Sequence, residues 1–383
     1  MPSTTTISGV QYSGIWTMQQ VNSAISAATW PTQPNLYAWG DNSAGKLGVG
    51  DITNRSNPTQ VGTVGGWSSV RFGAYSGAAI KNDGTLWTWG NGSYGGLGLG
   101  NATAYSSPKQ VGALTTWSKL AVAFYATLAI KTDGTLWSWG NGQYGCLGQG
   151  NVTDYSSPKQ IGALTTWLNV AAIYTNVAAV KTDGTLWTWG QGGSGGLGLG
   201  NVTSYSSPKQ VGALTSWLYV AAGIYFAAAV KTNGTLWTWG FGNGGQLGNG
   251  GATSVSSPIQ VGALTNWSQV KVGNSHVVAL KTDGTVWSWG VNTSGALGLN
   301  SATYAFSSPN QIGALTTWSY IDAGHFYSAA LKTDKTLWSW GANNVGQLGL
   351  GNTTAYSSPK QVGSVTSWTQ LSVGLTAAAA ITA

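Results

Sequence analysis

The chain has 383 residues, of which 58 are glycine and 22 are tryptophan, whereas charged residues make up only 7%. Glutamate is absent, and this composition disfavours helix and suits short strands joined by tight turns. The net charge of +7 is compatible with anionic partners, but no basic run with interleaved aromatic residues supports nucleic-acid binding. The single cysteine, Cys146, excludes an internal disulfide framework.

The first residues, MPSTTTISGV, contain neither a basic leader nor an apolar run, so we expect no signal peptide. No stretch of about 18 apolar residues occurs, and we therefore expect no membrane insertion.

Residues 1–34 are predicted to form a separate N-terminal segment with one short helix. Thr17 and Gln20 have the spacing of a capping box, and Pro31 ends the pattern. The apolar residues on one face of this helix are Met18, Val21, Ile25 and Ala28. An amphipathic helix of about a dozen residues is marginal alone, so we expect it to dock, either on the rest of the chain or on a partner.

From residue 35 onward the sequence repeats, and a Trp-Gly pair marks each copy. The seven tryptophans of these pairs are Trp39, Trp89, Trp139, Trp189, Trp239, Trp289 and Trp340. Their spacing is 50 residues five times and then 51, with the extra residue in the stretch LGLNSATYAFSSP. A period of about 50 residues is typical of propellers and repeat arrays.

Each copy predicts four short strands. In the copy at 117–162 these are WSKLAVA, TLAIKT, TLWSWG and SPKQIG. Asp133-Gly134 lies between the second and third, where a pair that can adopt positive φ favours a two-residue hairpin turn. Four antiparallel strands repeated radially form a propeller blade. The repeated tryptophans are then expected to fill the wedges between blades.

The first and last copies are incomplete in complementary ways. The first begins at its third strand, NLYAWG (35–40), and the chain ends with two strands, TQLSVGLTAAAAIT, that lack a third. Together the fragments make one blade. We therefore predict an all-β, seven-bladed propeller over 35–383, closed by pairing of the N-terminal strand with the C-terminal strands.

Catalysis has little support in the sequence. Five of the nine aspartates (Asp83, Asp133, Asp183, Asp283 and Asp334) belong to the repeated turn, and the others show no pairing. His276 and His325 are too few ligands for a metal site, and no serine or cysteine has a nucleophile context. We expect a protein without enzymatic activity, cofactor or metal.

Among the connections of each copy, the second-to-third turn KTDGT and the fourth-to-first link GALTTW barely change, whereas the turn between the first and second strands and the stretch after Trp-Gly vary. In an up-and-down blade these two connections emerge on the same face, which we call the variable face. The binding residues predicted there, near the axis, are Tyr75, Phe124, Tyr125, Tyr174, Asn176, Tyr225, Phe226, His276, His325, Phe326 and Tyr327, with Tyr94, Tyr144 and Phe241 further out. Such residues suit sugar stacking or a protein contact, or they plug the channel mouth.

The pattern A-A-[IVL]-K-T-D-G-T-L-W-x-W-G, followed by G-x-L-G-x-G and S-S-P, resembles the regulator of chromosome condensation repeat. The resemblance covers 35–383 and implies a seven-bladed propeller with four strands per blade. Propellers of this family serve as nucleotide exchange factors, ubiquitin-ligase modules, enzyme inhibitors and light sensors, so the fold does not fix the function. The Gly-Trp-Arg-His-Thr motifs of the plant ultraviolet photoreceptor do not occur.

Residues 7–34 are similar to short N-terminal segments of tail and fibre proteins of aquatic bacteriophages, which run from Gly-x-Trp-[ST] through a brief helix to Trp-Pro. The resemblance implies anchoring to other virion proteins through Trp16, Met18, Val21, Ile25 and Trp30.

We therefore hypothesise a virion protein, assembled in the host cytoplasm, whose variable face recognises a host-surface glycan or protein. One alternative is a capsid or tail decoration protein, and another is a cellular regulatory propeller that binds a protein partner. A homo-oligomer is compatible with each of these.

Overall fold

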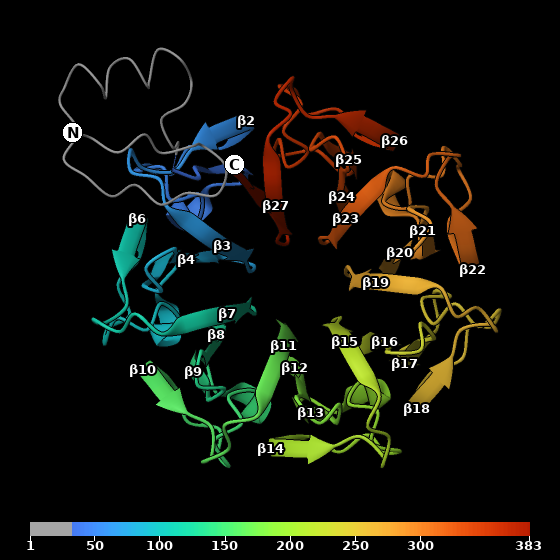
Figure 1. Ribbon diagram of the computed structural model, residues 1–383, viewed down its shortest axis with the longest axis horizontal. Coiled ribbons are helices and arrows are strands. Elements are labelled where there is room, and N and C mark those ends of the chain that lie inside the picture. Colours follow the sequence, from blue (N-terminus) through green and yellow to red (C-terminus); the bar gives the residue numbers. More distant parts are fainter. Residues whose placement is uncertain (1–32) are drawn as a thin grey trace, which may run out of the picture.

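The computed structural model describes residues 33–383, which form seven four-stranded antiparallel sheets around a central axis (Figure 1). We number the blades from the first complete one and give the strands of each from the axis outward. Blade 1 contains β3 (Trp67–Phe72), β4 (Ser76–Lys81), β5 (Leu86–Gly90) and β6 (Tyr105–Gln110); blade 2 contains β7 (Trp117–Val122), β8 (Ala126–Lys131), β9 (Leu136–Gly140) and β10 (Tyr155–Gln160); blade 3 contains β11 (Trp167–Ile173), β12 (Asn176–Lys181), β13 (Leu186–Gly190) and β14 (Tyr205–Gln210).

Blades 4 to 6 repeat this order. Blade 4 contains β15 (Trp217–Ala222), β16 (Phe226–Lys231), β17 (Leu236–Gly240) and β18 (Val255–Gln260); blade 5 contains β19 (Trp267–Val272), β20 (His276–Lys281), β21 (Val286–Val291) and β22 (Ala305–Gln311); blade 6 contains β23 (Trp318–Ala323), β24 (Tyr327–Lys332), β25 (Leu337–Gly341) and β26 (Tyr356–Gln361). Short 3-10 helices follow five of the third strands: η1 (Ser43–Gly45), η2 (Ser93–Gly95), η3 (Gln143–Gly145), η4 (Gly193–Gly195) and η5 (Thr293–Gly295).

The seventh sheet, the seam blade, combines the two ends of the repeat region. Its order is β27 (Trp368–Val373), β28 (Ala377–Thr382), β1 (Leu36–Gly40) and β2 (Arg55–Gln60). β1 pairs antiparallel with β28 from Leu36 opposite Ile381 to Gly40 opposite Ala377. The predicted ring closure is thus confirmed, as are the seven blades of four strands.

The predicted N-terminal helix and the anchoring residues Trp16, Met18, Val21, Ile25 and Trp30 lie outside the described residues. Within residues 33–383, no helix has the length and apolar character needed to span a bilayer.

The repeated turn between the second and third strands is held by an aspartate, a threonine and a tryptophan. In blade 2, Asp133 Oδ1 accepts hydrogen bonds from Thr135 N at 2.9 Å and Thr135 Oγ1 at 2.7 Å. Trp137 Nε1 in turn donates to Thr135 Oγ1 at 2.9 Å. Gly134 has φ +78°, which suits a residue without Cβ. The repetition of this turn therefore has a structural cause.

The repeated lysines lie over the repeated tryptophans. Lys131 Nζ is 3.7 Å from the ring centroid of Trp137 and 5.1 Å from that of Trp117, and the lysines of five other blades make the same two contacts. Each ammonium thus rests on the negative faces of two aromatic rings. Six of the 16 basic side chains are consequently part of the blade structure and indicate no anionic partner.

The aspartates of these turns predict that the fold loses stability at acid pH. Hydrogen bonds from the threonine side chain and backbone lower the pKa of Asp83, Asp133, Asp183, Asp283 and Asp334. A carboxyl group whose pKa is lower in the folded state stabilises the fold above its unfolded pKa, about 3.9, and loses that contribution as the pH falls through the folded pKa. We expect the melting temperature to fall in the acid range below about pH 4.

Asn233 provides the internal control, because it occupies the same turn in blade 4 and accepts from Thr235 Oγ1 at 2.8 Å without titrating. Replacing the five turn aspartates by asparagine should flatten the dependence of melting temperature on pH. An unchanged acid slope in that variant would assign the acid sensitivity to other groups.

Candidate functional site

The two variable connections lie side by side on one face of the ring, as the repeat comparison predicts. In blade 2 the residue after Trp139-Gly140 donates its backbone N–H to the turn between the first and second strands, from Asn141 N to Tyr125 O at 2.9 Å. The equivalent bonds elsewhere are Asn91 N to Tyr75 O, Gln191 N to Thr175 O, Phe241 N to Tyr225 O, Val291 N to Ser275 O, Ala342 N to Phe326 O and Asp41 N to Thr376 O. The constant connections bond to each other, as in Thr132 N to Thr116 O at 2.8 Å.

Five aromatic residues from blades 1 to 3 form a continuous cluster on the variable face, which we call the aromatic cluster. Tyr75 stacks on Tyr125 with ring centroids 5.0 Å apart, and Phe124 stacks on Tyr174 at 4.5 Å. Phe124 contacts both Tyr75 and Tyr125 edge to face at 4.8 Å. Tyr94, from η2, completes the cluster at 5.1 Å from Tyr125.

The aromatic cluster is only partly covered. Tyr94 is 49% exposed, whereas Tyr75, Phe124, Tyr125 and Tyr174 are half-buried. Burial, together with neighbouring tyrosines, raises the pKa of Tyr125 and of Tyr174. These phenols therefore stay neutral at physiological pH and offer hydroxyl groups and ring faces without charge.

Within residues 33–383, no ring-to-ring contact joins the other predicted residues to this cluster. Tyr225 and Tyr144 are exposed, whereas Phe241 is half-buried. His325 and Phe326 of blade 6 are half-buried and pack on each other with ring centroids 3.9 Å apart.

Four residues predicted on the variable face are instead buried: Asn176, Phe226, His276 and Tyr327, each at most 4% exposed. The reason is that the second strand begins at this position, so the side chain packs inside the ring. Tyr327 Oη donates to Ala377 O at 2.7 Å, and His276 Nε2 lies 2.9 Å from Ser328 Oγ. These side chains are therefore interior contacts and cannot meet a surface ligand.

His276 and Cys146, two side chains with potential reactivity, are buried. Burial, with a smaller effect of His325, lowers the pKa of His276 to about 4, so this imidazole is neutral at pH 7. Burial likewise raises the pKa of the Cys146 thiol to about 12, which suppresses the reactive thiolate. Among residues 33–383, no group of three or more histidine, cysteine or acidic side chains has the geometry to hold a metal ion.

A second set of candidate residues, which the sequence did not predict, lines the axis of the ring. The inner strands surround a cavity of about 480 Å³ along the axis, lined at one end by Phe124 and Tyr174 of the aromatic cluster. Arg71, Lys271 and Asp322 also line it. The fifth residue of the inner strand reads Arg, Ala, Ala, Ala, Lys, Asp and Ser through the seven blades, and this variation was the available signal.

Comparisons with solved structures identify similar folds. Human WBSCR16 has a TM-score of 0.82 at 21% identity, covering 92% of this chain and 99% of that chain. Prp20p from Saccharomyces cerevisiae, described with its binding to Gsp1p and histones, has a TM-score of 0.80 at 18% identity, covering 92% of each chain. Yeast Prp20 bound to Kap60 has a TM-score of 0.81 at 18% identity, covering 99% of this chain and 96% of that chain. At these identities the likeness shows the fold alone.

No curated protein sequence matches the chain significantly. The regulator of chromosome condensation (RCC1) repeat, by contrast, matches in seven consecutive copies, at residues 35–80, 83–130, 133–180, 183–230, 233–280, 283–331 and 334–381. A second description of the same repeat matches at 117–146, 267–296 and 318–347. Because the seven copies span nearly all of the propeller, the chain belongs to the regulator of chromosome condensation (RCC1) repeat family.

Proposed function

We propose that this protein is a non-enzymatic component of a bacteriophage particle whose variable face recognises a host-surface glycan. The aromatic cluster carries this proposal, because it gathers five rings from three blades where the repeats differ most. Residues 1–34, which resemble bacteriophage tail and fibre segments, would attach the propeller to other virion proteins.

The chemistry of the cluster favours a carbohydrate. Sugar rings present C–H groups that stack on aromatic faces, and neutral hydroxyl groups accept and donate hydrogen bonds to them. Tyr94 offers the most exposed ring of the cluster, and Tyr125 lies beside it. The cluster itself contains no charged side chain, which suits a neutral glycan better than a charged peptide.

Tyr94→Ala is expected to weaken glycan binding at least tenfold, which corresponds to about 1.4 kcal/mol for one lost stacking contact. The full-length chain would be applied to a panel of bacterial surface polysaccharides, and its melting temperature measured in parallel. The melting temperature should stay unchanged, because the Tyr94 side chain is largely exposed. Tyr94 has φ +60°, and because alanine also carries a Cβ, the substitution leaves the backbone strain at this position unchanged.

Tyr304→Ala is the matched control, since Tyr304 is 73% exposed and has no place in the aromatic cluster. It should bind as the parent does. If Tyr94→Ala and Tyr125→Ala both leave binding and host adsorption intact, the glycan proposal fails, and a decoration protein held only by virion subunits is favoured.

A regulatory propeller that binds a protein partner is the second candidate. Family membership supports it, because yeast Prp20p, of similar fold, is described as binding Gsp1p and histones. Deleting residues 1–34 separates the two functions. A regulator should keep its partner, whereas a virion component should lose its place on purified particles.

A further inference from the structure

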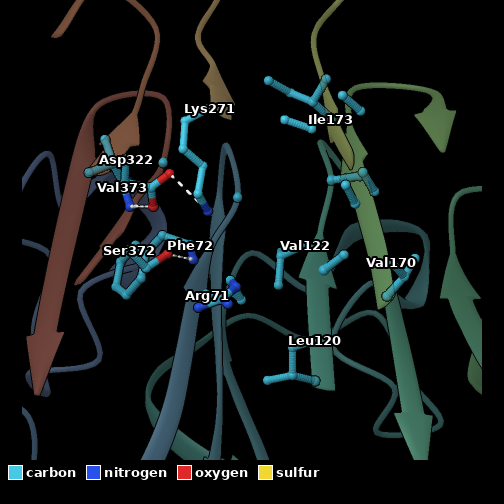
Figure 2. A pocket seen from close by; sticks show the side chains of 18 of the residues that line it. Arg71, Phe72, Leu120, Val122, Val170, Ile173, Lys271, Asp322, Ser372 and Val373 are labelled. Carbon is cyan, nitrogen blue, oxygen red and sulfur yellow. Dashed lines mark hydrogen bonds and ion pairs between the residues drawn. The ribbon is translucent and has the colours of Figure 1, made fainter. Parts of the chain in front are cut away.

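The axial cavity has chemically different walls. The fifth residues of the inner strands, on adjacent blades, are Arg71, Ser372, Asp322 and Lys271 on one side and Ala121, Ala171 and Ala221 on the other. Figure 2 shows the charged residues together at one wall, facing Leu120, Val122, Val170 and Ile173 at the opposite wall. The cavity thus combines a polar wall with an apolar one.

The acidic group of the polar wall is already engaged. Asp322 Oδ1 accepts from Ala323 N at 3.0 Å, and Asp322 Oδ2 accepts from Val373 N at 2.9 Å. Ser372 Oγ similarly accepts from Phe72 N at 3.0 Å. These bonds fix both side chains to neighbouring inner strands, so the polar wall is rigidly positioned.

The two cations retain unused donors. Arg71 donates from one guanidinium nitrogen to Val70 O at 2.7 Å, and within residues 33–383 this is the only hydrogen bond of its side chain. Lys271 Nζ lies 3.5 Å from Asp322 Oδ1 and 3.4 Å from Tyr320 Oη, which are long contacts, and it lies over the rings of Tyr219 and Tyr320. A guanidinium has five N–H donors and an ammonium three, so both can serve an additional acceptor.

The charges of the wall do not balance. Two cations face one carboxylate, and the Lys271 side chain is only 13% exposed. Burial disfavours its charged form, but the combined attraction of Asp322, Tyr219 and Tyr320 outweighs this and raises the pKa of Lys271 above its ordinary value. A cation that stays charged while largely desolvated gains most from an added anion, because attraction strengthens as water is excluded.

We propose that the axial cavity binds a small organic anion, with its carboxylate between Arg71 and Lys271 and an apolar ring against the apolar wall. A guanidinium binds carboxylates in a bidentate manner, which accounts for the arginine at this position. The cavity of about 480 Å³ is in the range of small-molecule sites. Phe124 and Tyr174 form the end of the cavity on the variable face.

Isothermal titration of the full-length chain with benzoate and phenylacetate tests the site, with benzamide as the neutral isostere. The carboxylates should bind, and benzamide should bind at least tenfold more weakly. Arg71→Gln and Lys271→Met should each weaken carboxylate binding at least tenfold. Arg71→Lys should restore part of the affinity, because it keeps the charge without the bidentate geometry.

Two further variants keep the proposal falsifiable if the charge substitutions impair folding. Ala171→Phe should abolish binding by filling the apolar side, whereas Lys209→Met, which removes an exposed lysine outside the cavity, should leave it unchanged. No carboxylate binding at millimolar concentration, or equal binding of benzamide, overturns the proposal. Glycan binding by the aromatic cluster is measured separately with Tyr94→Ala, so failure of one proposal is distinguishable from failure of the other.

Discussion

Deleting residues 377–383 is expected to abolish the cooperative thermal unfolding of the propeller. The deletion removes β28, which pairs with β1 on one side and β27 on the other. Its residues Ala377 to Ile381 are at most 1% exposed and pack on both neighbouring blades. We expect the loss to exceed the total stability of an ordinary domain, roughly 5–15 kcal/mol.

Circular dichroism melts of soluble protein would check this result, with deletion of residues 1–32 as a control that removes no described strand. The truncated chain should lack a sharp transition and should aggregate, because the edges of β1 and β27 lose their partner. A cooperative melt at the parental temperature would mean that the seam blade does not hold the ring closed.

A circular permutant tests the same idea in the opposite direction. Thr382 N donates to Asn35 O at 3.0 Å, just as Lys181 N donates to Thr185 O in blade 3. The seam therefore lacks only the Asp-Gly pair of the standard turn. Joining Ala383 to Asn35 through Asp-Gly, with new ends between the exposed residues Thr63 and Val64, should give a folded propeller at least as stable as the parent.

The fold was predictable because its determinants are local and repeated. Trp-Gly pairs at a fixed spacing, an Asp-Gly turn and two complementary partial copies are all visible in the sequence, and each predicts one structural feature that the structure contains. The structural role of the lysine that precedes each turn was not predictable from the sequence. Its cation–π contacts depend on tryptophans of two different strands, Trp117 and Trp137 in blade 2, which sequence spacing alone does not bring together.

The candidate site was predictable only in part, because the exact start of a strand decides whether a residue is exposed on the variable face or buried inside the ring. Comparison of the copies located the variable face and placed Tyr75, Tyr125 and Tyr174 on it. The same comparison misplaced His276 and Tyr327, which begin their strands and point inward. The axial charges were missed since Arg71, Lys271 and Asp322 are far apart in sequence and converge only when the ring closes.

The interfaces between blades predict the second large effect, a loss of about 3–5 kcal/mol for Trp189→Ala. Trp189 is fully buried, and its Nε1 donates to Cys146 O of the preceding blade at 2.9 Å. It also contacts Trp167 with ring centroids 6.0 Å apart. Removing the ring leaves a cavity and an unpaired carbonyl between blades 2 and 3, which chemical denaturation would measure as a lower free energy of unfolding.

Trp187→Ala is the matched control, two residues earlier on the same strand. Trp187 is half-buried, and its Nε1 bonds only Thr185 Oγ1 in the adjacent turn, at 2.9 Å. We expect a cost of roughly 1–2 kcal/mol, since Trp187 packs only at the edge of the cluster between blades 2 and 3 and part of its ring already meets solvent. Equal costs for the two substitutions would contradict the role assigned to the tryptophan of the Trp-Gly pair.

A double-mutant cycle with Gly148 isolates the contact between the blades. Gly148 of blade 2 has φ +69°, and a Cβ there would lie 2.9 Å from Trp189 Nε1. Gly148→Ala therefore carries backbone strain of about 1–2 kcal/mol and a clash with the indole. Only the clash disappears in the Trp189→Ala background, so the double variant should be less destabilised than the sum of the single variants. Strict additivity would show that glycine and indole do not contact each other, and the positive φ alone would then account for the glycine after each leucine of the repeat.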